Sequence, residues 1–159
     1  MFDWKDKVRS FRDVAGYSEY GGPASVLIGE EPAVLNNVQV TGNLFSVLGV
    51  RPFMGRTFTA EETWGSETPK VVLSYSAWRT HFGSDPNIIG RSFTFGSTST
   101  EIIGVMPEGF TFPAAETHVW TSYGFAREGR DQVWFRRAHF VRPIARLAPG
   151  VTFEQANAE

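Results

Sequence analysis

The chain has 159 residues, a formal net charge of −2, and 42% hydrophobic and 14% aromatic residues, which is enough for one core or for two small lobes that share an interface. This charge provides no overall field to concentrate nucleic acid or anionic lipid, so duplex binding is not expected. The chain has no cysteine, which excludes a disulfide framework and a thiolate metal site, and no apolar run approaches the roughly 18 residues of a membrane span; the sequence as given is predicted to be soluble.

The first quarter of the chain is predicted to form a helix and then a hairpin. Asp3 can cap a helix that ends at Gly16, and its apolar residues fall on one face: Trp4, Val8, Phe11 and Ala15. The segments 17–29 and 33–41 are predicted to be two strands joined by residues 30–32. We expect the helix to pack on this hairpin.

A strand, a helix and a glycine–proline return then occur twice. In the first copy, Thr41 or Asn43 caps a helix over residues 44–48, Gly49 ends it, and Pro52 prevents its resumption before the strand-like residues 56–59. In the second copy, a strand at 70–73 leads to a Ser74 or Ser76 cap, a helix to Phe82, a Gly83 terminator and, after Gly90-Arg91, a strand at 92–95. Two such units can bury together the faces that one leaves open, so the glycines are predicted to mark turns and not a ligand site.

The remaining segments are predicted as a surface loop, several strands and the start of a helix. The loop is residues 60–69, with strands at 101–106, 119–123 and 138–147, a connector at 124–132, and a helix capped by Thr152. Pro143 suggests that its strand lies at a sheet edge, because proline cannot donate a backbone hydrogen bond.

The sequence predicts no catalytic residue, no cofactor and no metal site. His81, His118 and His139 lack the spacing of a local zinc motif, and there is neither a nucleophile elbow nor a phosphate-binding glycine loop. The adjacent glutamates at 30–31 and 61–62 are expected to be solvated. The aromatic and arginine residues of 134–142 suit a half-buried strand better than a site for single-stranded nucleic acid.

Two sets of aromatic residues are candidates for binding a partner or a ligand. Trp64 is alone in its polar loop, where an indole can contact a partner protein or fold back as a loop anchor. Four further aromatic residues can line a groove or pack in the core: Phe110, Phe112, Trp120 and Tyr123.

Long blocks in a fixed order carry a family resemblance over nearly the whole chain. The blocks are FDWKDKVRSFRDVAGY, VQVTGNLFSVLGVRPFMGRTFTAEE, VVLSYSAWRTHFGSDPNIIGRSF, IIGVMPEGFTFP, HVWTSY and PIARLAPGVTFEQANAE. In these blocks the chain resembles the MacB-like periplasmic core domain of ABC-type export permeases, and is most similar to the duplicated orphan permease type.

The resemblance implies an α+β fold with two lobes. A porter-like lobe would be formed by both chain ends, residues 1–41 plus 133–159, and an inserted small α/β lobe by residues 42–124, with a connector at 125–132. It further implies a domain between two transmembrane helices of the permease, on the periplasmic face of the bacterial inner membrane. The chain would then be an excised segment of a membrane protein.

The function that the resemblance implies is mechanical and not catalytic. The domain would couple conformational change of the transmembrane helices to outward substrate movement or partner docking, with the lobe junction near Thr41 and residues 124–132. The implied partners are the rest of the permease, a cytoplasmic ATPase subunit and a periplasmic adaptor protein, and no nucleic acid. The alternative is a periplasmic small-molecule or peptide-binding module, which a well-formed pocket would favour.

Overall fold

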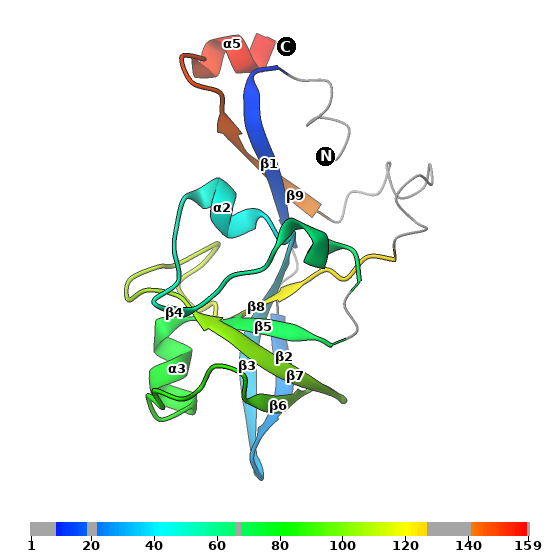
Figure 1. The fold of residues 1–159 in the computed structure, drawn as a ribbon, viewed down its shortest axis with the longest axis vertical. Helices are drawn as coiled ribbons and strands as arrows, with labels where there is room; N and C mark the ends of the chain where they lie inside the picture. The colour runs from blue at the N-terminus through cyan, green and yellow to red at the C-terminus, as the bar shows by residue number, and fades with distance from the viewer. Residues whose placement is uncertain (1–8, 19–21, 66–67, 127–140, 159) are drawn as a thin grey trace.

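The computed structural model describes residues 9–18, 22–65, 68–126 and 141–158. Figure 1 shows the arrangement of their helices and strands. In chain order the elements are β1 (Phe11–Ser18), β2 (Gly22–Ile28), β3 (Glu31–Val40), α2 (Leu44–Leu48), β4 (Met54–Gly55), the 3-10 helix η1 (Ala60–Thr63), β5 (Lys70–Leu73), α3 (Tyr75–His81), β6 (Ser92–Phe95), β7 (Thr98–Val105), β8 (Val119–Ser122), β9 (Val141–Leu147) and α5 (Phe153–Ala158).

Six of the strands close into a small barrel. The hydrogen-bonded order runs β2-β6-β7-β5-β8-β3, and β3 pairs back with β2, so the circuit is complete. The short β4 adds to β7, while β1 joins β3 at the single pair Tyr17–Val40. Because the sheet is closed, each of these six strands has a hydrogen-bonded neighbour on both sides.

The barrel wall separates two apolar cores, because successive side chains of a strand point to opposite faces. All six barrel strands contribute to the inner core, which Trp78 of α3 and Ile88 complete; its strand residues include Val26, Leu35, Leu73, Phe93, Ile102 and Val119. The outer core lies between α2 and the outward faces of β3, β5 and β8, and includes Val40, Leu44, Phe45, Val72 and Trp120. Trp120 is fully buried, and its Nε1–H donates to the Phe112 carbonyl at 2.9 Å.

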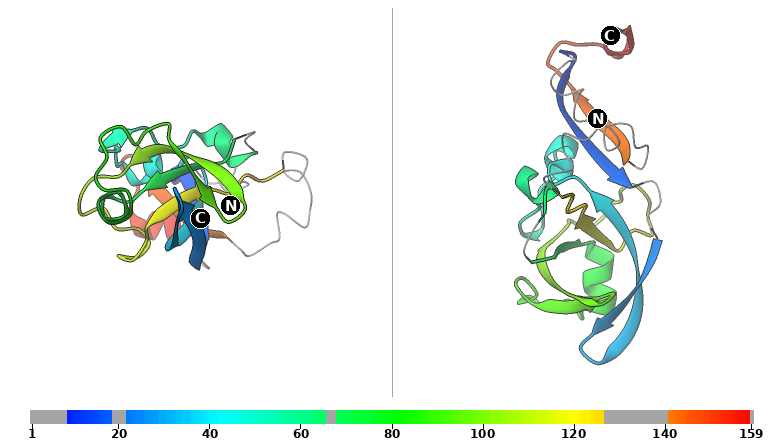
Figure 2. Two further views of the ribbon diagram at one scale, coloured as in Figure 1. Left: turned by 90° about the horizontal axis from the view of Figure 1, so that it is seen from below. Right: turned by 90° about the vertical axis from the view of Figure 1, so that its right-hand side faces the viewer.

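Strands β1 and β9 form a two-stranded arm that extends from the barrel (Figures 1 and 2). They pair antiparallel from Phe11–Leu147 to Ser18–Val141. The start of β1 and the end of β9, with α5 after it, therefore lie at the same end of the molecule. Among the described strands β9 pairs only with β1, which confirms the edge position predicted for Pro143.

The predicted helix up to Gly16 is wrong for residues 11–16, which are extended in β1; its first residues lie outside the described part. Their pairing with β9 explains the error, since a tertiary partner overrides a weak helical period that glycine already disfavours. The single strand predicted at 17–29 is also wrong, because Tyr17 and Ser18 belong to β1 and β2 begins at Gly22. The predicted hairpin itself is confirmed by the β2–β3 ladder.

Most of the predicted tandem unit is confirmed. Both helices occupy the predicted residues, Gly49 ends α2 with a φ of 74°, and the Ser74 Oγ caps α3 by accepting the Ala77 N–H. The strand predicted at 56–59 is wrong, since only Met54–Gly55 pairs, and Thr59 instead caps η1. The first copy of the unit therefore ends in the two-residue strand β4, whereas the second copy ends in the four-residue strand β6.

The other predicted segments have mixed outcomes. The strands at β7, β8 and β9 are confirmed, and so is the last helix, where Thr152 and Gln155 form reciprocal side-chain to backbone bonds of 2.9 and 3.2 Å. Residues 127–140, which hold most of the predicted connector, lie outside the described residues. The α+β class is confirmed, while the division into two lobes stays a prediction. In the structure the β2–β3 hairpin pairs with β6 and β8, within the barrel.

Candidate functional site

The first candidate site is the junction where the arm meets the barrel, at the point predicted near Thr41. The Gly16 N–H donates to Thr41 Oγ1 at 2.9 Å, and the Thr41 N–H donates to the Gly16 carbonyl at 2.8 Å. Thr41 is 2% exposed, so these bonds lie out of water, where losing one leaves a costly unpaired group. Thr41 thus ties β1 to the end of β3 and does not cap α2.

Asn43 extends this junction. It occupies the N-cap position of α2 without making a side-chain cap bond. Instead its Nδ2 donates to Asp13 Oδ2 at 3.1 Å and to the Val14 carbonyl at 3.0 Å, while its Oδ1 accepts from Thr41 Oγ1 at 2.8 Å. The amide therefore connects the start of α2 with β1.

The other strand of the arm reaches α2 through one arginine. Arg146 of β9 donates from Nε to the Val47 carbonyl at 2.7 Å. The guanidinium lies over Gly49, where an added Cβ would come within 2.8 Å of Nη2. A groove between α2 and the arm includes Arg12 and Ser46 in its lining. Both strands of the arm are thus bonded to the same short helix.

Gly42 fixes the junction to the barrel side. Its N–H donates to Thr63 Oγ1 at 2.8 Å, and an added Cβ would overlap the Thr59 carbonyl oxygen. Only glycine fits this approach between the end of β3 and η1.

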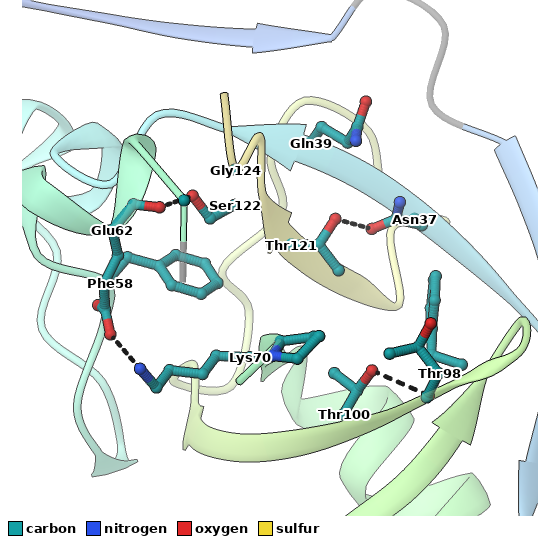
Figure 3. Close-up of a pocket in the computed structure, with 13 residues that line it drawn as sticks. Asn37, Gln39, Phe58, Glu62, Lys70, Thr98, Thr100, Thr121, Ser122 and Gly124 are labelled. Carbon is teal, nitrogen blue, oxygen red and sulfur yellow. Dashed lines mark hydrogen bonds and ion pairs between the residues drawn. The ribbon is translucent and has the colours of Figure 1, made fainter. Parts of the chain in front are cut away.

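The second candidate site is the open end of the barrel, which we call the barrel mouth: the cavity lined by Asn37, Gln39, Phe58, Glu62, Gly65, Pro69, Lys70, Phe95, Thr98, Thr100, Thr121, Ser122 and Gly124. Its volume is about 370 Å³. Figure 3 shows polar side chains of β3, β7 and β8 around it. Thr121 Oγ1 donates to Asn37 Oδ1 at 3.0 Å, and this bond joins the paired strands β8 and β3.

Glu62 forms an ion-pair network at the rim of the barrel mouth. Its carboxylate accepts from Arg56 Nη1 and Nη2 at 3.0 Å each, from Lys70 Nζ at 2.9 Å, and from the Thr59 N–H at 2.8 Å. Partial burial raises the pKa of Glu62, but the bonds from Arg56, Lys70 and Thr59 outweigh it and lower the pKa to about 2. The sequence-based expectation of a solvated glutamate is wrong here, because a six-residue separation hid the Arg56 partner.

Two histidines lie close together near the start of β8, whose last residues line the barrel mouth. The rings of His81 in α3 and His118, just before β8, have centroids 5.5 Å apart. His118 Nδ1 accepts the Asn36 N–H at 3.0 Å, and burial, with His81 beside it, lowers the pKa of His118. Within the described residues no group of three metal-ligating side chains forms. His139 lies outside them.

Trp64 does not have the exposure that would suit a contact residue in this structure. Its side chain is 8% exposed, and its ring lies 6.0 Å from that of Phe125. The loop-anchor alternative therefore describes the isolated domain, while partner contact by Trp64 stays a prediction. Phe110 and Phe112 pack against the outer core around Trp120, as the core alternative predicted for them.

The family model of the MacB-like periplasmic core domain matches residues 2–159. The chain belongs to this family. Membership makes it an extracytoplasmic domain of a MacB-like ABC-type transporter, as the block resemblance predicted. The curated protein sequences, in contrast, give no match.

Three solved structures share the fold of this family member. The periplasmic region of MacB from Actinobacillus actinomycetemcomitans has a TM-score of 0.71 at 15% identity, covering 98% of this chain and 67% of that one. The extracellular domain of the noncanonic ABC-type transporter YknZ from Gram-positive bacteria has a TM-score of 0.67 at 14% identity, covering 98% and 74%. A domain of a putative permease from Porphyromonas gingivalis has a TM-score of 0.68 at 12% identity, covering 98% and 70%.

None of the helices in the described part of the chain is both long and apolar enough to cross a bilayer. The structure brings together residues that the sequence analysis did not combine, notably Asp13, Asn43 and Arg146 at the junction. Asn43 and Asp13 are 30 residues apart in the sequence, and Arg146 and Val47 are 99 residues apart. No local sequence pattern indicates such contacts, so only the fold reveals them.

Proposed function

We propose that this domain lies on the outer side of the inner membrane and transmits movement of the transmembrane helices to outward substrate movement or to a docked partner. Its partners would be the rest of the permease, a cytoplasmic ATPase subunit and a periplasmic adaptor protein. It would carry out no covalent chemistry itself.

The antiparallel arm is the observation that carries this proposal. Because Phe11 pairs with Leu147, two membrane helices attached beyond β1 and α5 would stand side by side at one end of the domain. A relative shift of those helices would act first on the arm. The arm would then turn against the barrel, and the bonds that Thr41, Asn43 and Arg146 make across the junction would change with it.

A cross-link across the junction tests this coupling. These 159 residues have no cysteine, so in a complete permease whose remaining cysteines are replaced, a bifunctional maleimide can join Arg12→Cys and Ser46→Cys across their shared groove. Ser76→Cys with Thr80→Cys, both on α3, is the matched control because it links positions within one helix. Export is measured by comparing, through metabolite profiling, the compounds released by cells with and without the permease.

The junction cross-link should block release of the permease-dependent compounds while ATP hydrolysis continues, and the α3 cross-link should leave both unchanged. Full export through the cross-linked junction would refute the transmission role. A cysteine at Arg12 that a membrane-impermeant reagent reaches only from the cytoplasm would refute the location.

A further inference from the structure

We propose that the barrel mouth is a binding site for a small neutral ligand rich in hydroxyl groups, of the size of one or two sugar rings. A cavity of about 370 Å³ lies at the small end of the range for ligand sites, which recur in the mouths of β-barrels. This proposal is independent of the transmission role.

Three strands of the barrel, β3, β8 and β7, change from apolar to polar side chains along their inner faces. Along the inner face, Leu35 of β3 is followed by Asn37, and Val119 of β8 by Thr121. Strand β7 runs opposite to β8, and there the step in the same direction leads from Ile102 to Thr100. Apolar side chains fill the inner core of the barrel, and hydroxyl and amide groups from these three strands line the cavity.

The buried hydroxyl of Thr100 is the clearest sign of a ligand. Thr100 is 3% exposed and lines the cavity, yet its hydroxyl bond to the Thr98 carbonyl is long, at 3.3 Å, and joins residues only two apart. A valine has the same shape and would fill this position without a polar atom to satisfy. A buried hydroxyl with so weak a bond is costly for the fold alone, whereas a ligand hydroxyl could both donate to it and accept from it.

The lining favours a neutral ligand over a charged one. The interior groups Asn37, Thr100 and Thr121 are uncharged. At the rim, the Glu62 carboxylate already bonds both Arg56 and Lys70, so binding an anion or a cation there would have to compete with an existing network. The rings of Phe58 and Phe95, which also line the cavity, add apolar surface that suits the C–H faces of a sugar.

The closed sheet disfavours a peptide. An extended peptide binds a sheet by adding a strand to an open edge, but β3, β5, β7 and β8 around the barrel mouth each pair on both sides. A compact ligand that enters along the barrel axis needs no such edge.

The test is a titration of the ¹⁵N-labelled 159-residue chain, followed by amide chemical shifts, with glucose, N-acetylglucosamine and maltotriose as probes. Sodium phosphate and glycylglycine serve as charged and peptide-like comparators. Saturable shifts should appear at Thr98, Thr100 and Thr121 with at least one sugar. Stronger binding of maltotriose would indicate a glycan chain as the source, and equal binding a free sugar.

Thr100→Val and Thr121→Val should each weaken sugar binding about fivefold, as expected for one lost hydrogen bond of about 1 kcal/mol. Thr80→Val, on the exposed face of α3, removes a comparable hydroxyl and should leave affinity unchanged. Melting curves check that each variant is folded. Shifts with phosphate or glycylglycine alone, no saturable shifts with any sugar, or undiminished affinity in folded Thr100→Val and Thr121→Val would each overturn the proposal.

Discussion

The two glycine–proline returns have nearly the same sequence pattern and different surroundings. In the first return, an added Cβ on Gly55 would overlap the Ile103 carbonyl oxygen, and one on Gly49 would meet Arg146. In the second return, Gly83 and Gly90 also have positive φ, but no atom lies within 4 Å of an added Cβ. The first return is therefore packed tightly against the arm and β7, whereas the second bonds Ile102 of β7 through the backbone of Gly90 and Arg91 but leaves open space beside its glycines.

The arginines that follow the two returns differ in the same way. Arg56 joins the partly buried network of Glu62, while Arg91 pairs with Asp85 at the surface. A repeated sequence pattern thus specifies the same backbone turn twice, and the tertiary neighbours decide how much each copy contributes to stability. Substitutions matched between the copies can break or sharpen this comparison.

The largest difference should separate Gly55→Ala from Gly90→Ala. Both place a side chain at positive φ, which costs about 1–2 kcal/mol, but Gly55→Ala adds a clash with the backbone of β7 that raises the total to about 3–4 kcal/mol. Urea unfolding monitored by tryptophan fluorescence measures both free energies. Equal losses in the two variants would contradict the packed role of the first return.

Glu62→Gln should cost about 1–2 kcal/mol near neutral pH, after allowance for solvent screening of the partly exposed Arg56. Asp85→Asn, at the surface pair of the second return, should change stability little. Because the folded-state pKa of Glu62 is about 2, below the ordinary glutamate value of 4.5, its contribution is present above pH 4.5 and is lost as the pH falls toward 2. Unfolding curves across this pH range should therefore converge for Glu62→Gln and the unmodified chain; a constant gap down to pH 2 would refute the assignment.

Arg146→Met should loosen the first return at the arm and leave the second untouched. It keeps an apolar stem but removes the donor to the Val47 carbonyl, at a cost of about 1 kcal/mol. Hydrogen exchange should speed up in α2 and β1, with α3 unchanged as the internal control. Faster exchange in α3 as well would mean that the two returns are not independent.

The smallest predicted effect is a loss of folding stability on mild acidification, and it arises at α3, beside the second return. Burial and the neighbouring His81 lower the pKa of His118 below the ordinary histidine value of 6.5, so the folded state binds fewer protons and stability declines as the pH falls below 6.5. His118→Asn keeps an acceptor for the Asn36 N–H and should remove this decline, while His81→Asn should reduce it. A decline that persists unchanged in His118→Asn would assign it to other groups.

Local signals predicted the parts of the fold that the chain determines by itself. The α2 and α3 helices, with Gly49 and Ser74 at their ends, follow from caps, terminators and apolar spacing. The β1 strand was missed because its partner β9 is more than a hundred residues away, and its apolar residues also fit a helical period. Barrel closure and the roles of Asn43 and Arg146 depend on such distant pairings in the same way.

The barrel mouth shows the same limit for the candidate site. Asn37, Thr100 and Thr121 come from three different strands and line one cavity only in the closed sheet. Glu62 looked like a loop carboxylate because its partners Arg56 and Lys70 lie outside any recognisable motif. The family resemblance predicted the cellular context but contained nothing about these contacts.

The central claim is that the arm moves relative to a rigid barrel when the permease works. Spin labels at Arg12→Cys on the arm and Ser76→Cys on α3, in the complete permease with its ATPase, report this distance by pulsed electron resonance with ADP and with ATP. The account predicts a shifted distance distribution for this pair and an unchanged one for the barrel control, Ser25→Cys with Ser76→Cys. Identical arm-to-barrel distances in both nucleotide states would contradict it.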